Sequence, residues 1–492
     1  MPRKAERCLA KGEKALPVHE VAADVAGRTA AIEASRFPAN RCAGLAGSAH
    51  DRQHSAIDDR SPIITGLGAV SPLGPSAPAF IAGLRAGRSG VRLIEFDTAR
   101  IKSRVVASCP EFDASAVISS ADQKRLPRCV PMGLMAAQEA ITHARLDIPR
   151  GDSEADLDAA RRVGLILGTG AGGIDFTLDQ AMAAYTGGAD GRGRNPSLWT
   201  ITNATHGNLA GELSIRIGAR GPSMCISDGC ASASDAIGTA LGLIRSNRAG
   251  SPECVVVVGA DAHLRWETVL GMELLGVIST RDPGATGEDP ATMARPFDAT
   301  RDGFVLGEGA WAIVLESPKH AERRGARALG RLRGYGATCD AYHRVRPAPD
   351  AAEGVRAIRL AIEDAQLKPE EIEVVHYHGT ATPVNDELET RMVRMAFGGH
   401  ADRLVGHSVK GAIGHPQGAC GAASVVATFG AMIGLDGGDP FSVPTINLRE
   451  PDPVCDLDYT PNEAKPLEAR YALINCLAFG AKNSALVVEA CR

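Results

Sequence analysis

The chain has 492 residues, with 53 Lys and Arg against 58 Asp and Glu, which gives a formal charge of -5 at pH 7. This balance excludes a protein that binds nucleic acid or anionic membranes through bulk charge, because such binding needs a basic excess. With 44% hydrophobic and 23% charged residues, the chain can bury a large core, as two to three domains or as one duplicated unit.

Residues 1–60 differ from the rest of the chain. They are rich in Ala, carry mixed charge and have no strong strand pattern. Part of the segment could form an amphipathic helix, but a mobile extension or an upstream start codon accounts for it equally well. We expect no function there. We also expect no secretory signal and no membrane span, because the N-terminus has no apolar signal region and no apolar run reaches about 18 residues.

From Pro62 onward, short apolar runs alternate with glycine-rich turns and helix-length segments. The runs predicted as strands are 62–70, 163–173, 254–262, 309–317, 373–379, 404–409, 472–480 and 485–491. Continuous apolar strands separated by helical stretches such as 233–246 and 351–367 indicate a sheet covered by helices on both faces. The predicted class is α/β, with more than one layer of sheet.

Two distant segments resemble each other in pattern. Residues 221–244 and 405–433 each begin with a strand, continue through a turn of small residues and end in a helix rich in Ala and Gly. Such self-similarity suggests a duplicated core.

The 12 cysteines form no CxxC pair and have no His at zinc-finger spacing. Several lie inside apolar runs, such as Cys254 and Cys476, where a reduced cysteine behaves as a small hydrophobic residue. We therefore expect free thiols, a reducing cytoplasmic location and no metal site.

Cys230 is the first candidate for chemistry. A strand ends before it at Ser227, a turn follows through Asp228 and Gly229, and a helix begins just after it. Placed at a helix N-terminus, its sulfur would gain thiolate character and a lowered pKa, which makes a nucleophile. A buried, inert cysteine would fit the same spacing about equally well.

Three further candidate residues, His378, Lys410 and His415, lie in two glycine-rich turns that could face Cys230. His378 ends a predicted strand, where α/β enzymes place working groups, whereas His376 faces the opposite way by strand alternation. Lys410 and His415 lie in a second turn, and together they could tune imidazole and thiol protonation. Neither GxxxxGK[ST] nor a well-placed GxGxxG occurs, so a phosphate-binding loop is not indicated.

These motifs, in this order, resemble the β-ketoacyl-acyl carrier protein synthases of the elongating, Cys-His-His type. The resemblance runs from about residue 61 to the C-terminus. The segments that carry it are GLGAVSPLG (66–74), GPSMCISDGCAS (221–232), ARPFDATRDGFVLGEGA (294–310), HGTATP (378–383), KGAIGHPQGACGA (410–422) and AFGAKNS (478–484).

The resemblance implies a thiolase-like fold of five layers, αβαβα, in two similar halves. The halves would span residues 61–320, with the nucleophile, and 321–492, with the two histidines, behind the extension 1–60. It also implies a homodimer, with a heterodimer of related subunits as an alternative.

Carried over by resemblance, Cys230 accepts the acyl group while His378 and His415 drive decarboxylation of the malonyl extender. The backbone N–H groups of Cys230 and Phe479 would form the oxyanion hole. Phe479 also matches the gate between the acyl pocket and the malonyl side. No cofactor or metal is needed, because the substrates travel on the phosphopantetheine of an acyl carrier protein.

The remaining assignments are supporting ones. Lys410 would support the histidines, with Glu308 as its charge partner. Thr380 and Thr382 match positions that bind the phosphopantetheine arm. The acidic carrier protein would dock on basic side chains that could equally be ordinary solvated charges: Lys124, Arg125, Arg344 and Arg346.

The chain departs from the family pattern in three places. Asp228-Gly229 stands where Thr-Ala is usual before the nucleophile, a form closer to aromatic-polyketide ketosynthases. The usual Phe-Gly-Phe-Gly-Gly-Thr-Asn loop reads LAFGAKN at 477–483, so two glycines are lost and Lys482 replaces a small hydroxyl residue. Losing glycines stiffens a loop, which affects gating and acyl selectivity. The second histidine loop, HPQGACG, departs from the commoner aliphatic version.

The sequence thus predicts a decarboxylating condensation that gives 3-oxoacyl-acyl carrier protein, in a specialised fatty-acid or polyketide pathway. Housekeeping fatty-acid elongation is the nearest alternative. A non-catalytic subunit of the chain-length-factor kind is a second, but such subunits typically lack the nucleophilic cysteine. A thiolase acting on coenzyme A thioesters fits the histidine motifs less well.

Overall fold

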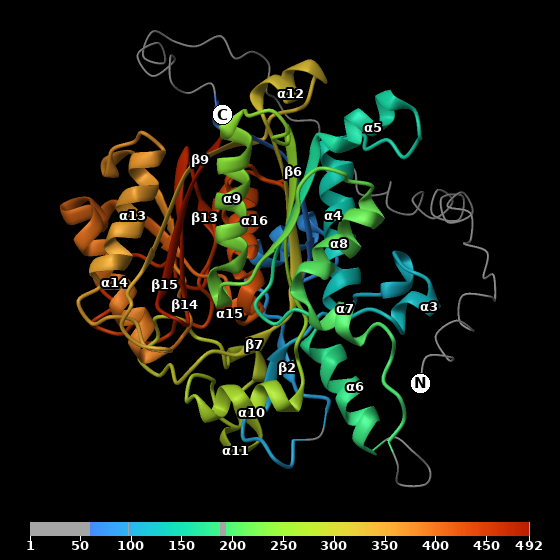
Figure 1. The fold of residues 1–492 in the computed structure, drawn as a ribbon. Coiled ribbons are helices and arrows are strands. Elements are labelled where there is room, and N and C mark those ends of the chain that lie inside the picture. Colours follow the sequence, from blue (N-terminus) through green and yellow to red (C-terminus); the bar gives the residue numbers. More distant parts are fainter. Residues whose placement is uncertain (1–59, 97, 187–192, 492) are drawn as a thin grey trace.

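The computed structural model describes residues 60–96, 98–186 and 193–491 (Figure 1). The extension predicted at residues 1–60 therefore lies, except for Arg60, outside the described residues.

The first half of the fold is a five-stranded mixed sheet. Its strands are β1 (Ile63–Val70), β4 (Val163–Gly168), β5 (Ser223–Ile226), β6 (Cys254–Asp261) and β8 (Gly309–Glu316). They lie in the order β5-β4-β6-β8-β1. β4 runs parallel to both β5 and β6, whereas β8 runs antiparallel to β6 and β1.

The second half repeats this arrangement. Its strands are β9 (Gly330–Cys339), β10 (Val374–His376), β11 (Val405–His407), β14 (Tyr471–Ala478) and β15 (Lys482–Ala490). Their order is β11-β10-β14-β15-β9, so each half has the order 3-2-4-5-1 when its strands are numbered along the chain. The strand directions also correspond. The sheets meet where Ile63 and Ile64 of β1 pair with β9.

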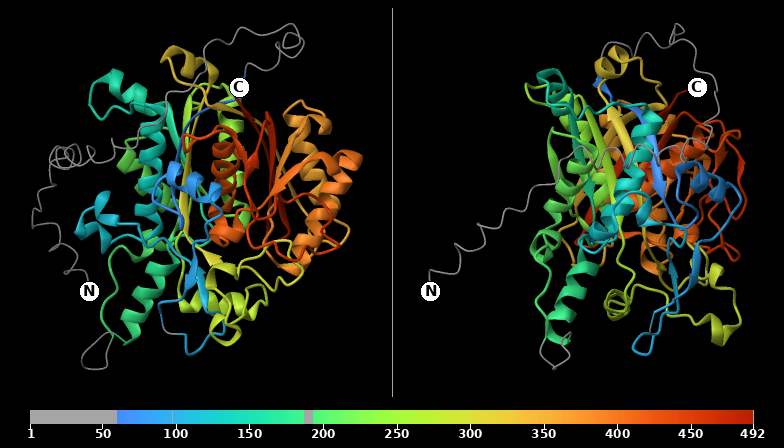
Figure 2. Two further views of the ribbon diagram at one scale, coloured as in Figure 1. Left: turned by 180° about the vertical axis from the view of Figure 1, so that it is seen from behind. Right: turned by 90° about the vertical axis from the view of Figure 1, so that its right-hand side faces the viewer.

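Helices form the other three layers. α4 (Cys129–Ala144) and α8 (His206–Ile217) pack on one outer side, and α13 (Ala352–Asp364), with α14 (Pro383–Phe397) beside it, on the other. Between the sheets lie α9 (Ser232–Ser246) and α16 (Cys420–Met432), as Figures 1 and 2 show. Every residue of α16 is buried. The predicted five-layered α/β fold is confirmed.

The helix and strand patterns explain these layers. α13 presents Val355, Ile358 and Ile362 at helical spacing and buries that face on the second sheet. All eight residues of β6 are buried, as expected for a strand covered on both faces. The helices predicted at 233–246 and 351–367 correspond to α9 and α13.

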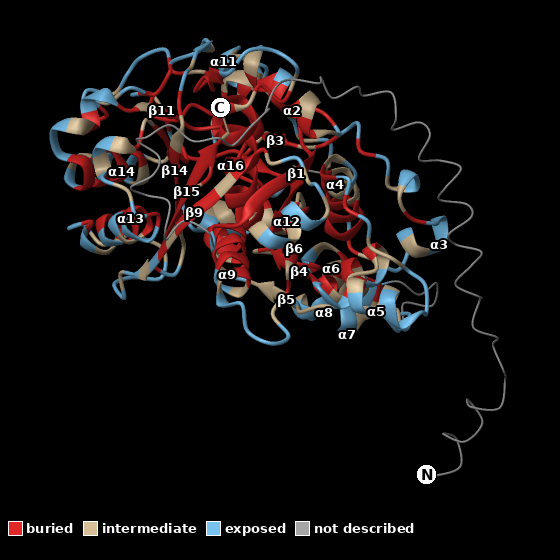
Figure 3. Ribbon diagram, turned by 90° about the horizontal axis from the view of Figure 1, so that it is seen from above, coloured by how far each residue is buried: buried red, intermediate tan, exposed pale blue. Residues whose placement is uncertain are grey.

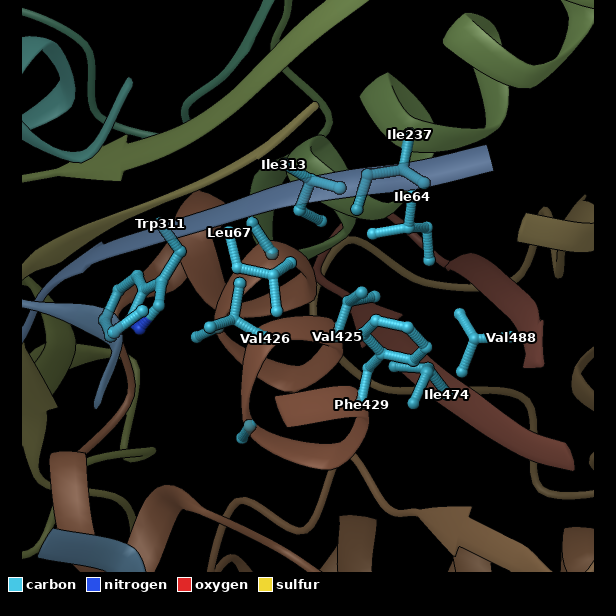
Figure 4. Packing of buried hydrophobic residues seen from close by; sticks show 14 of the residues in the cluster. Ile64, Leu67, Ile237, Trp311, Ile313, Val425, Val426, Phe429, Ile474 and Val488 are labelled. Atoms are coloured by element: carbon cyan, nitrogen blue, oxygen red, sulfur yellow. The ribbon is translucent and has the colours of Figure 1, made fainter. Parts of the chain in front are cut away.

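The core surrounds the central helices (Figure 4). Ile64 and Leu67 of β1, Trp311 of β8, Phe429 of α16 and Val488 of β15 belong to one buried cluster. Burial decreases toward the periphery of the molecule (Figure 3). With only 4% aromatic residues, this core rests mainly on Val, Ile, Leu and Ala.

Glycines in β1 allow one outer helix to approach closely. A Cβ at Gly66 or Gly68 would lie 2.0 Å from a backbone oxygen of α4, Ala140 or Ala136 respectively. The sequence surplus of glycine thus has a packing role here.

The remaining elements connect these layers. The other helices are α2 (Ala77–Arg85), α3 (Ser120–Gln123), α5 (Glu154–Arg161), α6 (Ile174–Thr186), α7 (Thr200–Ala204), α10 (Trp266–Leu274), α11 (Pro283–Thr286), α12 (Pro318–Arg323) and α15 (Lys410–Ile413). The other strands are β2 (Val91–Leu93), β3 (Val105–Ala107) and β7 (Leu306–Gly307) in one small sheet, and β12 (Phe441–Ser442) and β13 (Lys465–Pro466) in another. Within the described ranges, no helix has the length and apolar character that a membrane span requires.

Candidate active site

Cys230 lies in a tight turn between β5 and α9. The turn is a short 3-10 helix, Gly229–Ala231, and α9 begins at the next residue, Ser232. Gly229 has a φ of +62°, a left-handed conformation that glycine adopts without strain. The Cys230 side chain is buried, so the turn presents the sulfur to the interior of the molecule and away from bulk water.

His415 lies directly against this sulfur. Its Nε2 is 3.1 Å from Cys230 Sγ. The residue follows α15, which lies at the lower end of α9 in Figure 1, and its backbone N–H donates to the Val305 carbonyl at 2.7 Å. The ring of Phe304 packs edge-on against the imidazole, with 5.0 Å between ring centroids. Backbone and ring contacts together hold the imidazole against the thiol.

His378 brings a second imidazole to the same place. Its ring centroid lies 5.3 Å from that of His415, and the rings are nearly perpendicular. The Lys410 ammonium donates to the His378 carbonyl and lies 3.3 Å from His378 Nδ1. Because an ammonium group can only donate, Nδ1 must be the acceptor, and the imidazole proton belongs on Nε2.

Both imidazoles are neutral near pH 7. Burial lowers the pKa of His378 and of His415 well below the ordinary value of 6.5, and the positive charge of Lys410 lowers both further. Two neutral rings can each offer one N–H donor without adding positive charge to the site.

The expectation of a lowered thiol pKa at Cys230 is wrong. Burial raises the pKa of Cys230 above 9.0, and the neighbouring Cys420 raises it further, whereas Lys410 and a backbone hydrogen bond from Phe479 lower it by less. The local motif shows the helix start but not the loss of water around the sulfur. The resting nucleophile is therefore a thiol, with His415 Nε2 beside it to accept the proton.

These residues surround one cavity of about 450 Å³. Cys230, His378, His415 and Phe479 all line it. Thr380 and Thr382 line it as well, with their hydroxyl oxygens 2.9 Å apart. Thr382 also caps α14 by accepting from the backbone N–H of Asn385. Lys410 lies behind His378, so the structure brings together all the residues expected to share a site, apart from Glu308.

The predicted pairing of Glu308 with Lys410 is wrong. Glu308 instead accepts from the guanidinium of Arg128, with an Nη2–Oε1 distance of 2.9 Å, and from the backbone N–H of Cys109. Arg128 precedes α4, far away in sequence, so no local motif links it to Glu308. The Lys410 ammonium is directed to His378 instead.

The four basic residues predicted for docking fall in two places. Arg346 lines the cavity described above, and the carbonyl of Arg344 accepts from the backbone N–H of Gly480, next to Phe479. Lys124 lines a different hollow, beside α6, and Arg125 is its chain neighbour. All four side chains are exposed.

Two buried carboxylates were not predicted. Glu389 of α14 accepts from the backbone N–H groups of His378 and Gly379, at 2.6 and 2.8 Å, and from the amide of Asn475 at 2.6 Å. Burial raises the pKa of Glu389 to about 7. The sequence did indicate burial, because Glu389 lies on the same helix face as the apolar Val393, four residues later.

Asp261 is the second unpredicted carboxylate. It accepts from the backbone N–H of Gly170 and Ala171 in the first half, and of Gly418 in the second, the last at 2.7 Å. Gly418 follows His415 by three residues, so this buried carboxylate connects the second histidine loop to β6. Its place at the carboxyl end of a strand was the only sequence signal.

Comparison with known proteins identifies the family. The family described as "Beta-ketoacyl synthase, N-terminal domain" matches residues 60–321, and "Beta-ketoacyl synthase, C-terminal domain" matches residues 329–434. A 3-oxoacyl-[acyl-carrier-protein] synthase 2 of Synechocystis sp. is 35% identical over 88% of this chain and 99% of its own length. One from Staphylococcus aureus is 34% identical over 87% of this chain and 97% of its own length.

Solved structures give the same result. A β-ketoacyl synthase from Burkholderia phymatum superposes with a TM-score of 0.77 at 30% identity, covering 88% of this chain and all of the other. A ketosynthase in complex with its type II polyketide acyl carrier protein has a TM-score of 0.77 at 28% identity, with the same coverage. The chain belongs to the β-ketoacyl synthase family.

Proposed function

We propose that Cys230, His378 and His415 carry out the decarboxylating condensation that family membership assigns to this chain. An acyl group on the enzyme joins malonyl-acyl carrier protein to give 3-oxoacyl-acyl carrier protein and carbon dioxide. The observation that carries the proposal is the convergence of one thiol and two neutral imidazoles in a single cavity.

The first half-reaction is acyl transfer to Cys230. The thiol gives its proton to His415 Nε2, 3.1 Å away, as sulfur attacks the acyl thioester. The bond between the acyl carbon and the pantetheine sulfur then breaks, and the departing thiolate takes that proton from His415 and leaves as a thiol. The negative charge that develops on the carbonyl oxygen is stabilised by the backbone N–H groups of Cys230 and Phe479. Phe479 already makes a backbone hydrogen bond to Cys230, which supports this role.

The second half-reaction is decarboxylation and attack. Loss of carbon dioxide from the malonyl group leaves an enolate, whose oxygen accepts from the Nε2–H of His378 and an N–H of His415. The carbanion attacks the acyl carbonyl, the bond to Cys230 sulfur breaks, and the released Cys230 thiolate takes up a proton from water to restore the resting thiol. Lys410 positions the proton of His378 by occupying its Nδ1 side.

The substrates reach the site on an acyl carrier protein. Thr380 and Thr382 line the cavity where the phosphopantetheine arm would pass. Arg344 and Arg346 are the better candidates to dock the acidic carrier. Arg346 lines this cavity, and the Arg344 carbonyl accepts from the backbone N–H of Gly480 in the loop 477–481, which we call the gate loop because Phe479 matches the family's gate position. Lys124 and Arg125 stay weaker candidates, since Lys124 lines another hollow and Arg125 is its chain neighbour. We place the reaction in the cytoplasm, where the free cysteines of the described chain stay reduced.

We assign the enzyme to a specialised fatty-acid or polyketide pathway, because the loop at 477–482 and the turn at Asp228 depart from the usual pattern. The active form would be a homodimer or a pair with a related subunit; one similar solved structure, at 30% identity, is a ketosynthase with its chain length factor. A purely structural role for this chain is disfavoured, because Cys230 lies in the cavity with both imidazoles.

Malonyl-carrier decarboxylation tests the histidine assignment. We expect His378→Ala to lower the rate at least a hundredfold, since it removes a donor to the enolate. His376→Asn is the matched control: this buried neighbour packs against His407, and we expect only a few-fold loss. Equal losses in the two variants would contradict the assignment. A panel of acyl carriers then decides the pathway, because a housekeeping enzyme accepts saturated medium chains efficiently.

A further inference from the structure

Two further cysteines lie beside the nucleophile. Cys420 is the first residue of α16, and Cys476 lies in β14. Their sulfur atoms are 3.5 Å apart, and both side chains are buried. With Cys230 they form a separate sulfur-rich cluster. The proposed condensation uses neither of the two.

Both thiols contact the backbone of the nucleophile. The Cys230 carbonyl oxygen lies 3.0 Å from Cys420 Sγ and 3.1 Å from Cys476 Sγ, so each thiol can donate to it. Cys476 Sγ is also 3.7 Å from His378 Nδ1. The pair thus supports the turn that carries Cys230.

The two thiols differ in acidity. Burial raises the pKa of Cys420, but the hydrogen bond from Cys476 and the charge of Lys410 outweigh burial and lower it below 9.0. The same hydrogen bond, together with burial, raises the pKa of Cys476. Two sulfur atoms in contact at 3.5 Å can join in a disulfide once one of them has been oxidised. Cys129 and Cys254, which are equally buried, only have raised pKa values.

We propose that Cys420 and Cys476 are an oxidation site that closes reversibly to a disulfide. With hydrogen peroxide as the oxidant, the Cys420 thiol loses its proton, and its sulfur attacks one oxygen, breaks the O–O bond and becomes a sulfenic acid, while the hydroxide released takes up that proton as water. The Cys476 sulfur then attacks the Cys420 sulfur and displaces a second water. Overall, two thiols and one peroxide give one disulfide and two waters, and a dithiol reductant reverses the change.

Closure would affect the nucleophile directly. The sulfur atoms must approach from 3.5 Å to about 2 Å, and the disulfide has no S–H group left to donate to the Cys230 carbonyl. A buried carbonyl that loses its donors destabilises the conformation that holds it. We expect the acylation rate of Cys230 to fall about tenfold in the oxidised protein. This consequence rests on the proposed function, but disulfide formation itself does not.

The chemical test uses the full-length Cys230→Ala protein, so that the nucleophile cannot take part. After brief exposure to hydrogen peroxide and alkylation of free thiols, peptide mass spectrometry should find Cys420 linked to Cys476, with the loss of two hydrogens. The link should disappear after treatment with dithiothreitol. Only oxygen adducts at these positions, or links between other cysteines, would overturn the proposal whether or not the condensation assignment holds.

A functional test compares wild type with two serine variants. In wild type, we expect acylation to fall about tenfold after peroxide and to recover with dithiothreitol. Cys129 is a buried cysteine whose thiol donates a hydrogen bond to the Gly172 carbonyl. The acylation rate of Cys129→Ser should fall and recover like that of wild type. Cys420→Ser should lose this reversible component. If the acylation rate of Cys420→Ser falls after peroxide and recovers with dithiothreitol as in wild type, the disulfide does not control the nucleophile.

Discussion

Lys482 and Asp228 form an ion pair, with 2.5 Å between Nζ and Oδ1. Lys482 begins β15, directly after the gate loop that contains Phe479, and Asp228 lies two residues before Cys230. Each residue is a departure from the family pattern, and in this chain the two departures meet. The unusual lysine therefore links the gate loop to the nucleophile turn through the unusual aspartate.

Removing this ion pair should loosen the gate. Lys482→Thr and Asp228→Thr should each speed amide hydrogen exchange at residues 477–481. The two side chains are 37% and 35% exposed, so we expect the Lys482–Asp228 interaction to stabilise the loop by only about 0.5–1 kcal/mol. Because each single variant already removes the whole ion pair, amides in the double variant should exchange no faster than in the faster single variant. Exchange effects that add independently would contradict the link.

The backbone conformation of Ala481 should strain the same loop. Its φ is +65°, a left-handed conformation that costs a non-glycine residue roughly 1–2 kcal/mol. Ala481→Gly relieves this strain, although glycine adds entropy to the unfolded chain. Ala478→Gly, at the other lost glycine, relieves none because Ala478 lies in β14. Chemical denaturation should find Ala481→Gly more stable than Ala478→Gly by about 1 kcal/mol; the reverse order would exclude strain at Ala481.

Glu389 should be needed to position His378. Glu389→Gln presents an amide NH₂ to a place where backbone N–H groups of His378 and Gly379 donate, so one donor loses its acceptor. We expect a loss of about 1–3 kcal/mol in the free energy of unfolding and a decarboxylation rate at least tenfold lower. Glu387→Gln, an exposed position on the same helix, is the control and should change neither. Similar losses in both variants would exclude the positioning role.

The histidine protonation states predict an NMR result. Because burial and Lys410 hold the pKa of His378 and His415 well below 6.5, both rings should remain neutral at pH 6. In the unfolded chain the same histidines protonate near pH 6.5, so they lower stability as the pH falls below that value. Side-chain ¹⁵N shifts should identify a neutral His378 with its proton on Nε2. A charged imidazolium at pH 6 would contradict the account.

The sequence was sufficient to predict the fold class and to predict that Cys230, His378 and His415 lie together. Cys230 and His378 each lie in a short turn just after an apolar strand, and His415 lies in a glycine-rich turn just after α15. These features are local. The strand–turn–helix pattern that occurs twice in the sequence corresponds to two halves of the sheet with the same strand order, 3-2-4-5-1.

The supporting contacts could not be predicted, because they join segments distant in sequence. Glu308 pairs with Arg128, which lies 180 positions earlier, and not with Lys410. Burial of Cys230 depends on the whole surrounding core, so its raised pKa has no local signal. Cys476 was predicted to behave as a small hydrophobic residue, and only the folded chain brings it to Cys420 and the nucleophile.

The central claim is that Cys230 carries the acyl group between the two half-reactions. The most direct measurement is the intact mass of the full-length protein after incubation with an acyl-acyl carrier protein, followed by malonyl-acyl carrier protein. We expect one acyl group, mapped to Cys230, that disappears on the second addition as a product two carbons longer forms. A wild-type protein that forms this product without acquiring an acyl group at Cys230 would contradict it.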